Sequence, residues 1–175
     1  MKIRNSVQIG IIGDSHIRSE QQYEIAYEIG QEIARAKAIL VCGGRGGVME
    51  AACKGAFENN GITVGILPTD VVVDPNVNPY LTIRIPTFLH WTRNSLVPLA
   101  SDGVIAVGGQ AGTLTEIAYS WINHKPMVCI TSIKGWSKEI GERGYIDERE
   151  GRKIMTAETG TAAVQQILSA ISVSK

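Results

Sequence analysis

The sequence predicts one α/β domain with a mostly parallel, doubly wound sheet that carries helices on both faces. Short apolar runs such as 39–42 and 104–107 have the composition of strands buried on both faces. Segments with apolar residues at helical spacing alternate with these runs, which is the pattern of right-handed βαβ units. The chain of 175 residues is long enough for a single domain, 1–175, with a full hydrophobic core.

The predicted strands are short apolar runs bounded by turn residues. They are expected at 7–12, 39–42, 63–67, 81–85, 104–107, 127–130 and 154–157. Residues 68–80 are rich in proline, aspartate and asparagine and are predicted to form a surface loop. Residues 131–153 are polar and are expected to be irregular.

Helices are predicted between the strands. The first begins near Glu20, because residues 19–22 have the form of a capping box. Its apolar positions Ile25, Ile29 and Ile33 recur every four residues and should lie on the sheet. Further helices are expected at 48–58, 90–100, 114–122 and 162–173. Pro98 should kink the helix at 90–100 unless that helix begins near residue 94 or 95.

Bulk composition argues against several classes of protein. Lysine plus arginine and aspartate plus glutamate each number 17, so the formal net charge is zero and no nucleic-acid partner is expected. The three cysteines are an odd number without a C-x-x-C pair, so neither a disulfide framework nor a dedicated metal site of the protein is predicted. No signal-peptide pattern and no apolar run of ~20 residues occurs, so we expect a cytoplasmic protein without a membrane partner.

Two glycine-rich loops, 43–47 and 108–113, follow predicted strands and precede predicted helices. A third loop, 13–16, also follows a strand, and all three can line one crevice because the carboxyl ends of parallel strands meet at one edge. Backbone N–H groups at such turns bind anions, and the planar guanidinium of Arg45 can grip a phosphate. We therefore expect a small phosphorylated ligand. The alternative is that the glycines only permit tight turns and that Arg45 is solvated.

The usual nucleotide motifs are absent from the sequence. No G-x-G-x-x-G follows the first strand, and the second strand ends in Cys42 rather than in a ribose-binding acid, so NAD is not expected. The absence of G-x-x-x-x-G-K-[ST] disfavours ATP hydrolysis through a P-loop.

Several polar residues near the loops have two interpretations. Thr113 and Glu116 have the spacing of a capping box with Thr113 as the N-cap, so Glu116 is either a helix cap or a functional acid. Asp14 and Ser15 either cap a helix or contact a ligand. Arg93 is either an ordinary surface arginine or a residue of the site.

Three stretches together resemble the lysine-decarboxylase-like superfamily. They are GGRGGVME at 43–50, TRN at 92–94 and VGGQAGTLTE at 107–116. The resemblance covers about residues 7 to 173 and implies a Rossmann-like fold and a homo-oligomer, a dimer or a tetramer. One branch, the cytokinin-activating "lonely guy" enzymes, cleaves nucleoside 5′-monophosphates to a free base and ribose 5-phosphate. Its catalytic arginine and glutamate are matched by position by Arg93 and Glu116.

Two departures from the P-G-G-x-G-T-x-x-E motif of that branch favour a different branch. Val107 replaces the proline, and Ala111 lengthens the loop by one residue, so Glu116 need not point as it does in the hydrolases. The GGRGGVME stretch, the Arg-Asn pair and the Gly-Trp pair at 135–136 are more similar to molybdenum cofactor carrier proteins. Those proteins bind a phosphorylated metallopterin, molybdopterin carrying molybdenum, without turning it over.

The resemblance therefore favours a carrier that passes molybdenum cofactor to molybdoenzymes over an enzyme. The alternatives are a nucleoside 5′-monophosphate phosphoribohydrolase, in which Arg93 and Glu116 would be catalytic, and a non-catalytic nucleotide sensor. The residues predicted to bind the ligand and its phosphate are Gly13, Asp14, Ser15, Gly43, Gly44, Arg45, Gly46, Gly47, Arg93, Gly108, Gly109, Gln110, Ala111, Gly112, Thr113 and Glu116.

Overall fold

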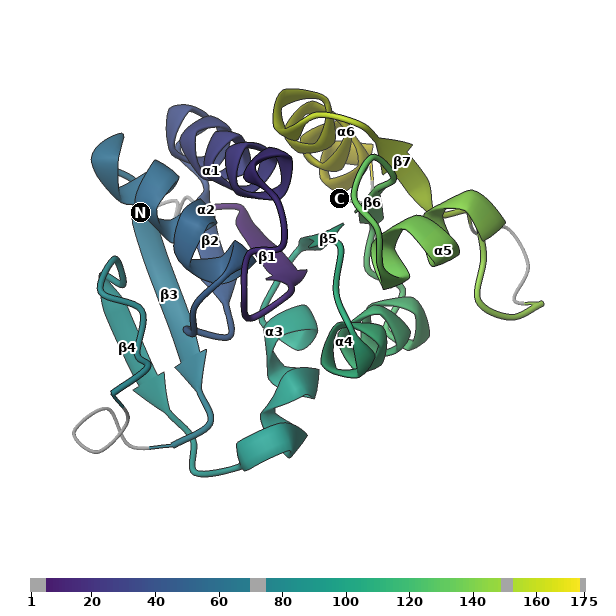
Figure 1. Cartoon of the computed structure of the whole chain (residues 1–175). Coiled ribbons are helices and arrows are strands. Elements are labelled where there is room, and N and C mark those ends of the chain that lie inside the picture. Colours follow the sequence, from purple (N-terminus) through teal and green to yellow (C-terminus); the bar gives the residue numbers. More distant parts are fainter. Residues whose placement is uncertain (1–5, 70–74, 149–152, 174–175) are drawn as a thin grey trace, which may run out of the picture.

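A parallel sheet forms the centre of the protein, with helices packed on both of its faces (Figure 1). The computed structural model describes residues 6–69, 75–148 and 153–173. Within these ranges, seven strands pair in parallel in the order β4-β3-β2-β1-β5-β6-β7. They are β1 (Gln8–Gly13), β2 (Ile39–Cys42), β3 (Ile62–Leu67), β4 (Ile83–Pro86), β5 (Gly103–Val107), β6 (Met127–Ile130) and β7 (Met155–Ala157).

The order of the strands confirms the predicted doubly wound α/β fold. From β1 the chain adds β2, β3 and β4 on one side, and then returns to add β5, β6 and β7 on the other. Adjacent strands β1 and β5 therefore send their following loops to opposite faces of the sheet. The crevice at their carboxyl ends is the place where ligands bind in open α/β sheets.

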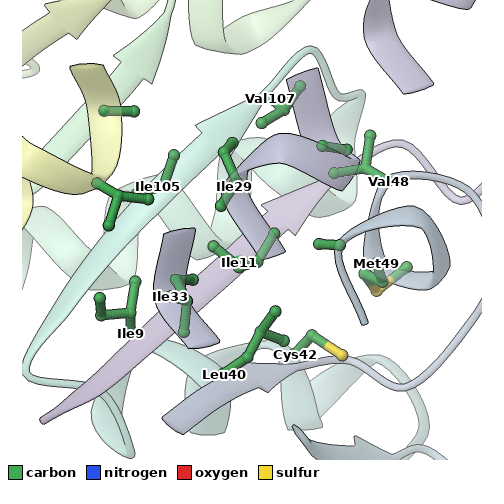
Figure 2. Close-up of a cluster of buried hydrophobic side chains, with 14 of the residues drawn as sticks. Ile9, Ile11, Ile29, Ile33, Leu40, Cys42, Val48, Met49, Ile105 and Val107 are labelled. Atoms are coloured by element: carbon green, nitrogen blue, oxygen red, sulfur yellow. The ribbon is translucent and has the colours of Figure 1, made fainter. Parts of the chain in front are cut away.

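Each face of the sheet has its own layer of helices and its own core. One layer is α1 (Glu20–Arg35), α2 (Val48–Glu58) and α6 (Gly160–Val173); the other is the 3-10 helix η1 (His90–Ser95), α3 (Leu96–Leu99), α4 (Ala111–Ile122) and α5 (Trp136–Arg143). Successive strand residues alternate between them, so Ile11 packs in the first core and Ile12 in the second. Figure 2 shows the first core, where Ile29 and Ile33 lie over the sheet.

The first helix begins where the sequence predicts. The Ser19 hydroxyl accepts a hydrogen bond of 3.1 Å from the backbone N–H of Gln22, as an N-cap does. Ile25, Ile29 and Ile33 are all buried, which confirms the face expected from their spacing.

Two glycines allow α1 and α2 to pack closely against each other. A side-chain Cβ at Gly30 would overlap the carbonyl oxygen of Ala52, and one at Gly55 would overlap the carbonyl oxygen of Tyr27. Each helix thus places a glycine against the backbone of the other. The two helices therefore approach each other more closely than side chains at these two positions would allow.

We expect Gly30→Ala to destabilise the protein by about 1–3 kcal/mol, because the added methyl group must push the two helices apart. Alanine favours a helix over glycine by roughly 1 kcal/mol, so helix propensity alone predicts the opposite sign. Urea unfolding of the two proteins measures the difference, with Glu24→Ala on the exposed side of α1 as a control near zero. A more stable Gly30→Ala protein would show that the crossing is not tight.

The predicted capping box at Thr113 and Glu116 is wrong. Helix α4 already begins at Ala111, after Gln110, which makes no side-chain capping bond. Thr113 and Glu116 lie inside the helix, and both are buried. The local pattern failed because hydrogen bonds from distant residues hold the preceding glycines, and the helix starts three residues earlier.

Of two other segments, one differs from the sequence prediction and one agrees with its alternative. Residues 131–153 are not irregular throughout, because α5 lies within them; its short length and its single strongly buried apolar residue, Ile140, weaken the helical pattern. The stretch at 90–100 is a 3-10 helix followed by a short α-helix with Ser95 as its N-cap. This agrees with the alternative of a helix that begins near residue 94 or 95 and is not kinked by Pro98. Pro98 is the third residue of α3, where a missing N–H costs no intrahelical bond.

The loop at 68–80 is only partly a surface segment. Asn78 is buried, and its side-chain amide donates to the carbonyl oxygen of Met49 at 3.3 Å. Residues 70–74 of this predicted loop lie outside the described residues. In the part of the chain that the structure describes, no helix is both long enough and apolar enough to cross a membrane.

Candidate functional site

A cavity of about 1300 Å³ lies at the carboxyl ends of the strands, where the three predicted loops meet. The predicted site residues that line it are Gly13, Asp14, Ser15, Arg45, Gly46, Gly47, Arg93, Gln110, Gly112, Thr113 and Glu116. The remaining predicted residues, Gly43, Gly44, Gly108, Gly109 and Ala111, are not among its lining residues. The structure therefore gathers most of the predicted site around one cavity, and five of the predicted residues do not line it.

The buried carboxylate of Asp14 joins the loops that surround the cavity. One of its oxygens accepts hydrogen bonds from the backbone N–H of Gly109 at 2.8 Å and from the side-chain amide of Gln22 at 2.9 Å. The other accepts from Arg18 Nε at 3.1 Å. The backbone carbonyl of Asp14 accepts from Val48 N–H at the start of α2. Asp14 is thus a positioning residue, which holds the starts of α1 and α2 and the loop before α4 together.

Several glycine amides are already used inside the protein. Gly108 N–H donates to the Ser137 hydroxyl at 2.7 Å, and Gly109 N–H donates to Asp14. Gly44 N–H points to the sulfur of Cys42 at 3.3 Å. Residues at the starts of α2 and α4 also line the cavity, and first-turn N–H groups of a helix have no acceptor within the helix. At α2 the N–H of Val48 is already bonded to the Asp14 carbonyl.

Arg93 is buried beneath the cavity with part of its guanidinium unsatisfied. Only 7% of the residue is exposed, so the interpretation of Arg93 as an ordinary surface arginine is wrong. Among the described residues, no group accepts a hydrogen bond from its Nε or Nη1. Gly43 makes room for it, because a Cβ there would overlap the guanidinium. Buried donors without acceptors are costly, so this arrangement indicates a place for an anion.

Glu116 is the acidic neighbour of Arg93. Its Oε1 lies 3.8 Å from Arg93 Nη1, which is too long for a hydrogen bond, and both side chains are buried. Burial raises the pKa of Glu116 to about 8, although the nearby guanidinium acts in the opposite direction. At neutral pH the carboxyl group therefore holds a proton, and Arg93 keeps an uncompensated positive charge.

The charged lining of the cavity is positive overall. Its cationic residues are Arg18, Arg45, Lys54 and Arg93, and its acidic residues are Asp14, Glu50 and Glu116. Asp14 is paired with Arg18, and Glu116 is protonated below about pH 8. A neutral chain thus concentrates positive charge where its loops and two helix starts meet, which attracts anions.

Some residues that line the cavity were not predicted from the sequence. Tyr23, Lys54 and Tyr80 line it, together with Trp91 and Asn94. Tyr23 lies in the first turn of α1, beside the predicted cap, so its place near a strand end could have been inferred. Lys54 and Tyr80 carry no such signal, because only the packing of 75–80 against α2 brings them to the cavity.

A doubly wound parallel sheet with a cationic cavity at the reversal of its strand order defines a protein of the Rossmann-like α/β class. The sequence pattern of the SLOG cluster4 family matches residues 6–164, and the chain belongs to this family. The match agrees with the resemblance found in the loop motifs.

Solved structures and characterised relatives are similar over most of their length. The molybdenum cofactor binding protein of the phototrophic bacterium Rippkaea orientalis is 32% identical, with a TM-score of 0.83 over 96% of this chain and 99% of that one. The Moco carrier protein of Chlamydomonas reinhardtii is 28% identical, with a TM-score of 0.81 over 98% of this chain and 100% of that one. Cytokinin riboside 5′-monophosphate phosphoribohydrolase of Mycobacterium tuberculosis is 27% identical over 136 residues, 70% of this chain and 73% of its own. These similarities confirm the resemblance to the superfamily and to its carrier branch.

The protonation of Glu116 predicts a pH-dependent stability. The folded chain holds this proton up to about pH 8, whereas the unfolded chain releases it near the ordinary glutamate pKa of 4.5. Between these values the folded state binds more protons, so its stability falls as the pH rises. Wild-type protein should therefore lose stability relative to Glu116→Gln between pH 5 and pH 8.5, by on the order of a few kcal/mol.

Thermal unfolding of both proteins across this pH range measures the effect. Glu24→Gln, at an exposed position of α1, is the matched control and should follow the wild type. A constant difference between wild type and Glu116→Gln at all pH values would contradict the prediction.

Proposed function

We propose that this protein is a carrier that binds molybdenum cofactor and releases it to molybdoenzymes without chemical change. The observation that carries the proposal is the buried, unsatisfied guanidinium of Arg93 in a cationic cavity between two helix starts. Such a site suits the terminal phosphate of the pterin. The similarity to cofactor-binding and carrier proteins along nearly the whole chain supports the choice of ligand.

The residues fit a phosphorylated metallopterin as cargo. Arg45 and Arg93 would hold the phosphate together with the first-turn N–H groups of α2 and α4. Each charge-assisted hydrogen bond contributes roughly 1.5–3 kcal/mol. Micromolar binding requires about 8 kcal/mol, so a few such bonds and burial of the ring suffice after the costs of association. Binding of this strength also permits release.

A second candidate, hydrolysis of nucleoside 5′-monophosphates, is favoured by the Arg93–Glu116 pair. Both side chains line the cavity, and the pKa of Glu116 near 8 suits a general acid at neutral pH. Water would then attack the ribose C1′ as the C1′–N bond to the base breaks, and Glu116 would give its proton to the departing base. The resulting Glu116 carboxylate would take up the proton that the water loses, while Arg93 steadies the phosphate. The phosphoribohydrolase of M. tuberculosis is the relative that supports this alternative.

One experiment separates the carrier from the hydrolase. The protein is incubated with AMP while free adenine is followed by chromatography, and in parallel with molybdenum cofactor while retained cofactor is measured. We expect cofactor at about one equivalent per chain and little adenine, because a displacement of ~1 Å in the longer loop can cost 10²-fold in rate. Rapid release of adenine that Glu116→Gln abolishes would establish the hydrolase instead.

Arginine variants test the phosphate site in the same assay. Arg45→Ala and Arg93→Gln should each weaken cofactor binding by roughly 1.5–3 kcal/mol, since each removes a charged donor. Arg84→Ala, which removes an exposed arginine of β4 outside the cavity, is the control. Unchanged affinity in both cavity variants would refute the proposed phosphate site.

We also propose that the protein is a homo-oligomer. The sequence places the large apolar side chains of Trp91 and Trp121 near helix faces beside the site, which predicts association through helices in both regions. For Trp121 this prediction is wrong, because the residue is 4% exposed and donates from Nε1 to Asp147. Trp91 is 80% exposed and ends a continuous segment whose apolar side chains are open to solvent. The exposed apolar residues of this segment are Ile83, Ile85, Phe88, Leu89 and Trp91.

Light scattering at micromolar concentration should show a dimer or tetramer. Phe88→Ser should shift it towards monomer, because apolar patches of this kind mark protein interfaces. Phe88 is preferred to Trp91 for the test because Trp91 also lines the cavity. Phe57→Ser, at an exposed position of α2, is the control. A wild-type monomer would rule out the oligomer.

A further inference from the structure

The cavity has two ends that differ in chemistry. The end near η1 and α4 contains Arg93 and Glu116, and we call it the Arg93 end. The other end contains Tyr23 of α1, Lys54 of α2 and Tyr80, and we call it the Tyr80 end. The first set comes from the helix layer on one face of the sheet, and the second comes from the layer on the opposite face.

The Tyr80 end is built from aromatic rings that are held in place from behind. Tyr23 stacks on Tyr27, with ring centroids 6.1 Å apart and an angle of 16° between the ring planes. Tyr80 packs against Phe57, with centroids 6.0 Å apart. Tyr27 and Phe57 are not lining residues of the cavity, so each cavity tyrosine is backed by a second ring. Rings fixed in this way lose little freedom when another ring stacks on them.

Hydrogen bonds also hold the backbone of Tyr80 in place. Tyr80 N–H donates to the side-chain oxygen of Asn78 at 2.9 Å, and its carbonyl accepts from the Thr63 hydroxyl at 2.6 Å. Asn78 in turn donates from its backbone N–H to Gly44 and from its side chain to Met49. Hydrogen bonds through Asn78 therefore connect the Tyr80 end directly to the glycine loop 43–47.

Cationic side chains line the cavity beyond the Arg93 end as well. They are Arg45, Arg18, which is paired with Asp14, and Lys54, which is hydrogen-bonded to Tyr23. One terminal phosphate needs only part of this charge. The cavity of about 1300 Å³ also exceeds the roughly 300–1,000 Å³ of most small-ligand sites.

We propose that the Tyr80 end is a second subsite, which binds an aromatic base joined to the first half of the ligand through a diphosphate. The protein then accepts a nucleotide-extended form of its ligand. The first half occupies the Arg93 end, the diphosphate lies over the central loops beside Arg45 and Arg18, and the base stacks at Tyr80 and Tyr23. This inference rests on the proposed function for the identity of the first half.

The test compares two forms of one ligand. The probes are molybdenum cofactor with a free terminal phosphate and the same cofactor extended by cytidine monophosphate through a diphosphate. Stacking of one base is worth about 10- to 100-fold in affinity. We expect the wild-type protein to bind the extended form tighter by this factor, and Tyr80→Ala to reduce it to the affinity of the shorter form.

Three variants control for a general effect on the fold. Tyr80→Ala should leave the affinity for the shorter form within about 2-fold, since that form does not reach the second subsite. Tyr80→Phe keeps the ring and should keep the preference for the extended form. Tyr145→Ala removes an exposed tyrosine outside the cavity and should change neither affinity. Equal wild-type affinities for the two forms, or equal losses of both forms in Tyr80→Ala, would overturn the second subsite while leaving the carrier intact.

A second pair of probes separates this inference from the proposed function. If neither form of the cofactor binds, the carrier proposal fails, and AMP is then compared with diadenosine diphosphate by the same titration. Tighter binding of diadenosine diphosphate that depends on Tyr80 would support the second subsite for a nucleotide ligand. Equal affinity for these two probes would overturn it.

Discussion

The buried carboxylate of Asp14 is the constraint on which the arrangement of the site depends. It lies at the end of β1 and accepts hydrogen bonds from Gly109, Gln22 and Arg18, which belong to the loop before α4, to α1 and to the segment before α1. Its carbonyl also fixes the start of α2 through Val48. One residue thus holds three loops that leave different strands, and it fixes their positions around the cavity.

As a result, the backbone amides of the glycine loop and the charged side chains have different roles at the cavity. The amides of Gly108 and Gly109 are used to hold the loop, and what faces the cavity is the beginning of two helices together with Arg45 and Arg93. Burying Arg93 with unsatisfied donors costs stability. Proteins accept such costs at functional sites, where the local rules of folding are broken for the sake of binding. Burial of Glu116, which raises the pKa of its carboxyl group, likewise costs stability.

Much of the fold and part of the site could be predicted from the sequence alone. The spacing of Ile25, Ile29 and Ile33 and the cap at Ser19 are local patterns, and local hydrogen bonding and burial decided those elements. The gathering of the three loops also followed from sequence, because the carboxyl ends of parallel strands share one edge. The spacing of apolar residues and the order of strands and helices in the chain were sufficient to predict those features that depend on residues close in sequence.

Only the tertiary structure decided the roles of individual polar residues. The pattern at Thr113 and Glu116 predicted a helix cap, but a hydrogen bond between residues 95 positions apart set the loop before that helix. Arg93 became a buried cation because Gly43, in the loop after β2, leaves room for its guanidinium. Trp91 and Trp121 look alike in sequence, yet one is exposed and the other is core. Burial, partner and charge state arise from contacts between distant segments, and no local pattern in one sequence records them.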